Sequence, residues 1–193
     1  MIDKVIKDRL SEAKLLKSQY RRKEIRKHLD YYSGTSTEQY IRPYFQGDAF
    51  SEIPPALQNF TRKFINKISG IYTLGAKRNI GDTTERYNEL IPTKDVRMKH
   101  SERMTRLLGT IANRVYWNDG KFDYRPIYYF ESYFDENPFK PTAIIYPLLN
   151  KTEDLSDTSP LQWEYWDSEK YIIMNEDGDI QDEKENPYGI LPF

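Results

Sequence analysis

The sequence predicts an α+β fold in which an N-terminal helical part is followed by antiparallel β-hairpins. Three observations lead to this prediction. The segment Asp3–Tyr32 contains no glycine or proline. A second segment carries apolar side chains at spacings of three and four residues, and from Val115 onward aromatic-rich runs alternate with turn residues. We therefore expect residues 1–113 to be mainly helical and residues 114–193 to be mainly antiparallel β.

Asp3–Tyr32 predicts one long helix, because helix-compatible residues continue until the end signal Ser33-Gly34. Lysines and arginines surround a thin apolar stripe on this helix. The stripe consists of Ile6, Leu10, Ala13, Leu16, Tyr20, Ile25, Leu29 and Tyr32. Residues 33–53 hold several turn formers and predict a loop.

A second helix is expected after Pro54-Pro55 and ends near Gly75. It has the clearest core stripe of the chain, formed by Leu57, Phe60, Phe64, Ile68 and Ile71. After the polar stretch Ala76–Thr93, a third helix is expected over Thr93–Asn113. Its inward-facing residues are Met104, Leu107, Leu108 and Ile111.

The β part begins with a hairpin signal. Val115-Tyr116-Trp117 and the aromatic run Phe122–Tyr133 flank Asn118-Asp119-Gly120, which favours a tight turn between two strands. The strands expected after it are Thr142–Leu148, Leu161–Trp166 and Tyr171–Met174, followed by a turn at Asp177-Gly178 and a short acidic stretch.

Composition excludes several classes of site. The 193 residues include no cysteine, so disulfides, thiolate catalysis and cysteine-type metal sites are absent. The longest run without a charged residue is Pro141–Asn150, ten residues, whereas a membrane span needs about 18 or more. No apolar signal-peptide core follows Met1. We expect a protein of the cytoplasm that does not cross a bilayer.

Charge is distributed unevenly along the chain, although the net charge is only −1. Residues 1–30 hold ten Lys and Arg against five Asp and Glu, whereas residues 151–193 hold three against twelve. Such polarity can orient subunits or partners. The cations Arg21, Arg22, Lys23, Arg26 and Lys27 are the candidate contact with nucleic acid or with another subunit. A solvated helix face is the other explanation.

Two segments are similar to ligand-binding loops, but each has a simpler structural explanation. Gly70–Arg78 is similar to a phosphate loop but has Ala76 where the lysine belongs, which favours a helix end. Asn175–Asp179 is similar to a calcium loop, but Ile173 and Lys184 occupy two positions that require carboxylates, so a hairpin turn is expected. We therefore expect no metal site and no cofactor.

No catalytic residue is predicted, and we expect the protein not to be an enzyme. His28 and His100 both lie beside basic residues and are interpreted as surface histidines. The carboxylates that could form a nuclease cluster lack an accompanying Glu-x-Lys element. These carboxylates are Asp123, Glu131, Asp135 and Glu136.

The closing segment Glu185–Phe193 ends in apolar side chains with no polar tail behind them. We expect that this element needs further chain to cover it, and that the β part continues beyond Phe193.

Three segments resemble the N-terminal half of tailed-bacteriophage portal proteins. They are Tyr31-Tyr32-Ser33-Gly34, the helix start Pro54–Phe60 with Ile65-Asn66-Lys67-Ile68 inside the helix, and Glu185–Phe193 with its Asn-Pro-Tyr-Gly and Leu-Pro-Phe pieces. The order of the helices and hairpins, including Gly109-Thr110-Ile111 and Tyr165-Trp166-Asp167, is also similar. The likeness covers nearly the whole chain, and its most specific part is the closing segment.

The resemblance implies a structural subunit of a ring, typically dodecameric, at one vertex of the capsid. In that family DNA passes through the ring, the terminase motor and neck proteins attach to it, and this segment would form mainly the outer wing. The expected location is the virion, after assembly in the host cytoplasm. Two other functions remain open: a different head–tail adaptor or structural protein, and a nucleic-acid-binding or metal-dependent nuclease domain.

Overall fold

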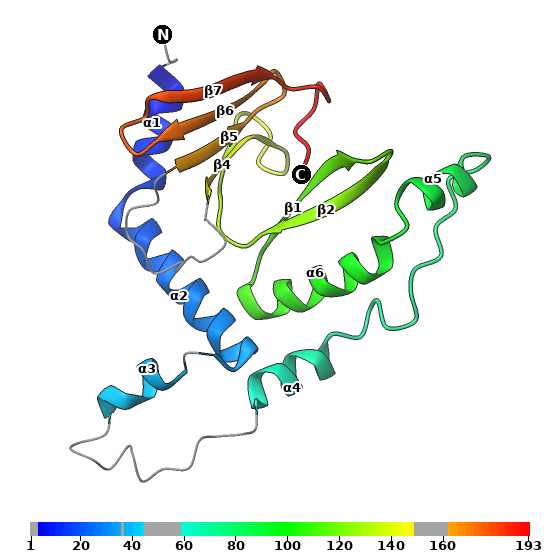
Figure 1. Ribbon diagram of the computed structural model, residues 1–193, viewed down its shortest axis with the longest axis horizontal. Helices are drawn as coiled ribbons and strands as arrows, with labels where there is room; N and C mark the ends of the chain where they lie inside the picture. Colours follow the sequence, from blue (N-terminus) through cyan, green and yellow to red (C-terminus); the bar gives the residue numbers. More distant parts are fainter. Residues whose placement is uncertain (1–3, 36, 45–58, 149–161) are drawn as a thin grey trace. The chain divides into compact units, whose positions relative to one another are not determined.

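The computed structural model describes residues 4–35, 37–44, 59–148 and 162–193 of the chain. It confirms the α+β fold, with helices followed by antiparallel sheets (Figure 1). The chain forms two compact units. The sheet unit comprises Met1–Lys23 and Ile111–Phe193, and the helical unit comprises Glu24–Thr110. The boundary at residue 113, predicted from secondary structure alone, stays a prediction.

The described elements follow in this order. The helices are α1 Lys4–Ala13, α2 Leu16–Ser33, α3 Glu38–Ile41, the 3₁₀ turn η1 Arg42–Tyr44, α4 Phe60–Ile68, α5 Thr84–Leu90 and α6 Lys94–Leu108. The strands are β1 Ala112–Asn118, β2 Lys121–Ile127, β3 Glu131–Phe134, β4 Pro141–Leu148, β5 Gln162–Trp166, β6 Lys170–Asn175 and β7 Ile180–Glu185.

The prediction of one helix over Asp3–Tyr32 is wrong, because the helix breaks at Lys14 and Leu15 into α1 and α2. Buried positions recur at spacings of three and four within α1 and from Ser18 to Ile25 in α2, but Ala13 and Ser18 are five positions apart. An unbroken helix would turn Ser18 away from the sheet unit, so the break restores the phase of the buried face. The face consists of Ile6, Leu10, Ala13, Ser18 and Arg22, and Tyr20 of the predicted stripe is exposed.

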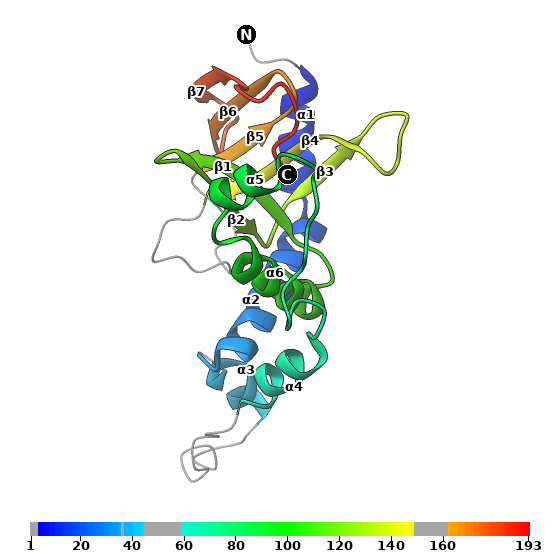
Figure 2. The same ribbon diagram turned by 90° about the vertical axis from the view of Figure 1, so that its right-hand side faces the viewer.

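The sheet unit is built on an antiparallel five-stranded sheet in the order β3-β4-β5-β6-β7. One face is covered by α1 and the start of α2 (Figure 2). The Tyr133 hydroxyl donates to the Arg9 carbonyl on α1 at 2.6 Å, and the β6–β7 turn approaches Leu10. Side chains alternate between faces, so one set meets the helices. This set is Ala143, Ile145, Trp163, Tyr165, Ile172 and Met174, all buried.

The opposite face packs on the β1–β2 hairpin and on the closing segment. Its core comprises Ala112, Ile127, Ile144, Tyr146 and Trp166. Leu191 and Phe193 pack against this core, and the Val115 amide donates to the Pro192 carbonyl at 2.8 Å. The sheet unit thus covers part of this closing segment, while Ile190 is 67% exposed, and the expectation that the β part continues beyond Phe193 stays a prediction.

The β1–β2 hairpin confirms the turn predicted at Asn118-Asp119-Gly120. Asp119 and Gly120 have φ angles of 47° and 78°, as a type I′ turn requires at its two central positions. The prediction of a single strand over Phe122–Tyr133 is wrong, because β2 ends at Ile127 and β3 belongs to the other sheet. The three later strands are confirmed within one residue or two, and the acidic stretch after Gly178 forms β7.

The helical unit differs more from the expectation. The predicted second helix is shorter, because α4 begins after the cap residue Asn59 and ends at Ile68. Its predicted core stripe is wrong: Ile65 is buried, whereas the predicted residues from Phe60 to Ile71 are exposed. Helical spacing identifies an apolar face but not what covers it. Leu57 lies outside the described residues.

The rest of the helical unit contains more helix than expected. The predicted loop over residues 33–53 includes α3 and η1, and the polar stretch Ala76–Thr93 includes α5. The third helix is confirmed as α6, but it ends at Leu108 with Gly109 at φ 85°. Met104 is buried as predicted, while Ile111 lies beyond the helix.

Candidate functional site

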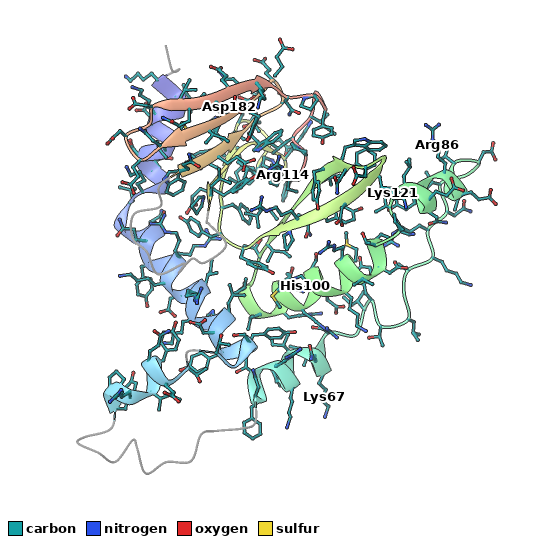
Figure 3. All side chains as sticks on the ribbon, viewed as in Figure 1. Lys67, Arg86, His100, Arg114, Lys121 and Asp182 are labelled. Atoms are coloured by element: carbon teal, nitrogen blue, oxygen red, sulfur yellow. The ribbon has the colours of Figure 1, made fainter. Side chains whose placement is uncertain are left out.

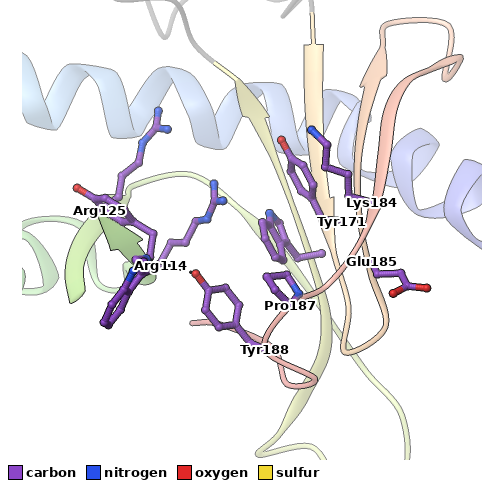
Figure 4. A pocket seen from close by; sticks show the side chains of 10 residues that line it. Arg114, Arg125, Tyr171, Lys184, Glu185, Pro187 and Tyr188 are labelled. Atoms are coloured by element: carbon purple, nitrogen blue, oxygen red, sulfur yellow. Dashed lines mark hydrogen bonds between the residues drawn. The ribbon is translucent and has the colours of Figure 1, made fainter. Parts of the chain in front are cut away.

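The sheet unit has an open recess of about 680 Å³ beside the β1–β2 hairpin (Figure 4). Both strands of the hairpin, β5–β7 and the closing segment contribute to it. Five of its ten lining side chains are aromatic. The lining consists of Arg114, Tyr116, Trp117, Arg125, Trp166, Tyr171, Lys184, Glu185, Pro187 and Tyr188.

Arg114 forms the inner wall of this recess. Its Nη1 contacts the Glu164 Oε1 at 2.5 Å and donates to the Tyr146 hydroxyl at 3.2 Å. The guanidinium carbon lies 4.5 Å from the centre of the Trp166 ring, and the Trp166 Nε1 donates to the same carboxylate oxygen at 2.7 Å. Glu164 is buried. The charge of Arg114 is thus balanced inside the protein, and its main effect is to hold the rings in place.

The rim of the recess is more accessible. Trp117 is 51% exposed and contacts Phe122 edge-on, with the ring centres 4.7 Å apart. The Trp117 amide donates to the Tyr188 hydroxyl at 3.3 Å. Lys184 contacts Asp182 at 2.6 Å. With two of its three cations paired, the recess suits an aromatic or aliphatic side chain better than a phosphate chain, which requires several cations.

A second feature is a set of exposed apolar side chains on α4 and on the segment after it. Its five members are between 41% and 99% exposed: Phe60, Phe64, Ile68, Ile71 and Leu74. The segment 59–81 that carries them has five Lys and Arg and no Asp or Glu. Lys67 extends from α4 into solvent (Figure 3). A cluster of large exposed apolar side chains indicates a surface that binds a partner.

In comparisons with known proteins, no family model and no curated protein matches this chain. Among the described helices, none is long and apolar enough to span a membrane.

The five basic residues singled out from the sequence all lie on α2. Arg21, Arg22 and Lys23 belong to the sheet unit, and Arg26 and Lys27 to the helical unit. For Arg22 the prediction of a contact surface is corrected, because this side chain is only 2% exposed and lies over the Tyr129 and Trp163 rings at 5.3 and 5.4 Å.

The other four basic residues are placed differently. Arg21 lies 3.7 Å from Glu131. Arg26 contacts the buried Asp30 at 3.0 Å. Lys23 is exposed, and the Lys27 Nζ lies 6.0 Å from the centre of the Tyr40 ring. For these four, a contact with nucleic acid or another subunit stays a prediction.

Replacing Arg22 with alanine is expected to lower the free energy of unfolding by about 1–3 kcal/mol, through lost packing on two rings. The exposed neighbour Lys23→Ala is the matched control and should change it by less than about 0.5 kcal/mol. Urea unfolding followed by tryptophan fluorescence compares the two. Equal stability of both variants would contradict the buried position of Arg22.

The calcium-like segment forms the β6–β7 hairpin turn, as expected, with the Asp179 amide donating to the Asn175 side chain at 2.7 Å. At the phosphate-loop-like segment, α4 has already ended at Ile68, and the next helix begins only at Thr84. Within the described ranges, no three His, Asp or Glu side chains gather as metal ligands would.

The two histidines lie in the helical unit. His28 is exposed. His100 on α6 is half-buried, and its pKa is lowered by this burial and by the nearby Arg97 and Arg103 cations.

Two features of these sites were not predicted from the sequence. The Arg114–Glu164 pair was not predicted, although a carboxylate within the aromatic strand Gln162–Trp166 was a usable signal, because a buried carboxylate needs a cation. The α4 face was found as a stripe but assigned to the core.

Proposed function

We propose that this chain is a structural subunit of a phage portal ring at the capsid vertex, where DNA passes during packaging and ejection. Terminase, neck proteins and the capsid protein are its proposed partners. The proposal rests on the resemblance of the Tyr31–Gly34, Pro54–Phe60 and Glu185–Phe193 segments to that family, and on an α+β fold compatible with it.

The structural observation that carries the proposal is the apolar face of α4. Phe60 and Phe64 are 72% and 62% exposed, so about 100 Å² or more of aromatic surface contacts water in an isolated chain. Burying it against a partner is favourable at about 25 cal/mol per Å². In a ring of identical copies every such face meets a neighbour, and none remains exposed.

Electron microscopy of negatively stained particles tests the proposal, with protein expressed from the complete open reading frame. We expect closed rings with a central opening that a chelator leaves unchanged. A monodisperse monomer would contradict the portal function. Assembly only on another phage protein would instead indicate an adaptor, and magnesium-dependent DNA cleavage a nuclease.

A further inference from the structure

We infer that copies of the sheet unit contact each other head-to-tail: the β3–β4 loop of one copy, residues 135–140, docks into the aromatic recess of the next copy. This inference rests on the proposed ring, and it names the two surfaces that meet. Both surfaces belong to the sheet unit, and they differ from each other, as a heterologous contact requires.

The two surfaces lie on opposite sides of the sheet unit. The loop joins β3 to β4 at one edge of the five-stranded sheet, whereas β7, which lines the recess, is the strand at the other edge. Figure 2 shows the β3–β4 loop extending to one side of the sheet and the β1–β2 hairpin to the other. The loop of one chain therefore points away from its own recess and is available to the recess of a second copy.

The loop presents an aromatic ring to solvent in a fixed position. Phe139 is 93% exposed. Its amide donates to the Asn137 side chain at 2.9 Å, and the Lys140 amide donates to the Asn137 carbonyl at 3.2 Å. These hydrogen bonds and the fixed φ angle of Pro138 hold the backbone at Phe139 in place, which lowers the entropy lost when the loop docks.

Arg125 selects the charge of the occupant. Arg114 and Arg125 are directly opposite each other on β1 and β2, and Figure 4 shows their side chains extending in the same direction. Two like charges at such positions are unfavourable. Arg114 is neutralised by Glu164, and Lys184 pairs with Asp182. Arg125 is exposed and forms no ion pair with any described residue. The recess therefore favours an aromatic group that is accompanied by a carboxylate.

The β3–β4 loop has this combination of ring and charge. Asp135 and Glu136 are exposed, and neither pairs with a cation in the part of the chain that the structure describes. Lys140 is the only cation of the loop, which is thus net negative. The exposed aromatic residues described elsewhere outside the recess have cations and no carboxylate within three residues in the sequence. They are Tyr20, Tyr44, Phe60 and Phe64.

The recess has room for the Phe139 ring. Its volume of about 680 Å³ lies within the range of about 300–1,000 Å³ that is typical of ligand pockets. The Trp117 and Tyr188 rings line it, and Trp117 is 51% exposed. Docking covers the exposed rings of both copies with aromatic contacts. Glu136, three residues before Phe139, then lies at the rim and pairs with Arg125.

Two variants of the full-length protein remove one surface each. Phe139→Ser removes the ring from the loop, and Trp117→Ala removes a ring from the recess. Each is expected to raise the dissociation constant between copies at least about tenfold and to abolish rings in mass photometry. The matched control is Leu15→Ser, at a 53% exposed position of the same unit outside both surfaces, which should form rings as the wild type does.

Mixing the two defective variants tests whether the surfaces meet each other. The Phe139→Ser chain keeps an intact recess, and the Trp117→Ala chain keeps an intact loop, so the mixture should form dimers with one working contact and no rings. The fluorescence of Trp117 in the Phe139→Ser chain should shift to shorter wavelength on mixing, because the docked ring excludes water. The other two tryptophans are at most 3% exposed and should not respond.

A cysteine pair tests the contact directly, because the chain has no cysteine of its own. Glu136→Cys and Arg125→Cys in one chain change positions on opposite sides of the unit, so a disulfide between them forms only between copies. Mild oxidation should give a ladder of covalent oligomers on a non-reducing gel. The control pair Leu15→Cys and Arg125→Cys should give no such ladder.

The outcomes separate this inference from the proposed function. Rings that persist in Phe139→Ser, or a Glu136→Cys/Arg125→Cys chain that gives no covalent ladder, would overturn the inference and leave the portal proposal standing. Both of these measurements stand even if Trp117→Ala misfolds. Loss of rings without dimers on mixing two folded variants would also overturn the inference. A wild-type chain that forms no rings would overturn the proposed function itself.

Discussion

Replacing Arg114 with methionine is expected to lower the free energy of unfolding of the sheet unit by about 3–5 kcal/mol. Methionine fills much of the same volume but leaves the Glu164 carboxylate, which is 1% exposed, without its cation. The carboxylate would retain neutral partners, the Trp166 indole N–H and the Tyr146 hydroxyl, and neutral donors do not offset the desolvation of a full charge. Urea unfolding followed by far-UV circular dichroism measures the loss.

The double variant Arg114→Met/Glu164→Gln is the control that isolates this cause. Glutamine keeps an acceptor for the Trp166 indole and removes the charge, so the double variant should regain at least half of the lost stability. Lys121→Met, at an exposed position of the same hairpin, should be neutral within about 0.5 kcal/mol. Equal stability of the single and double variants would show that the buried charge is not the cause.

Stability is expected to fall steeply above pH 10, because the sheet unit buries several tyrosine hydroxyls. Burial and the Asp167 carboxylate raise the pKa of Tyr165 to about 12. Burial is also the main cause that raises the pKa of Tyr129. It is likewise the main cause for Tyr146, and the nearby Glu164 charge raises the pKa of Tyr146 further. These three side chains are at most 3% exposed.

The sign follows from proton binding. A tyrosine whose pKa is raised by folding holds its proton more tightly in the native state, so its contribution is complete below the unfolded pKa of about 10. Above pH 10 each such tyrosine lowers the free energy of unfolding by about 1.4 kcal/mol per pH unit. These three tyrosines alone contribute a slope near 4 kcal/mol per unit, and Tyr133, whose pKa burial also raises, adds to it. For Tyr165 the loss is complete near pH 12.

Denaturant midpoints measured from pH 8 to pH 12 test this slope. Tyr165→Phe should lower it by about 1.4 kcal/mol per pH unit, because one fewer proton is linked to unfolding. Tyr44→Phe, at an 86% exposed position, should leave the slope as in the wild type. A stability that stays flat between pH 10 and pH 11 would contradict the burial of these hydroxyls.

The strands were predictable because their signals are local. Asp119-Gly120 requires positive φ angles that few residue pairs adopt, and the run Thr142–Leu148 is apolar on both faces because β4 lies inside the sheet with layers on each side. The break at Lys14 was not predictable from propensity. It depends on the phase of Ser18 and Arg22 against strands more than 100 residues away.

The candidate sites were harder to predict, because they depend on the tertiary environment. Arg22 and Lys23 are adjacent cations in one basic run, yet the first lies between two rings and the second in water. Nothing in the sequence distinguishes the buried cation from the exposed one. The Phe60–Phe64 row shows the same limit, since a buried stripe and an exposed docking face have identical spacing.

The packing of α1 on β4 has a consequence for synthesis at the ribosome. The helix ends at Ala13 and β4 ends at Leu148, so its strand partners emerge 135 residues later. At a translation rate of roughly 5–20 residues per second, about 7–27 seconds pass before the surface that buries Ile6 and Leu10 has been synthesised. During that time the apolar face of α1 lacks its sheet, and this unit reaches its native state only after its β-strands have been translated.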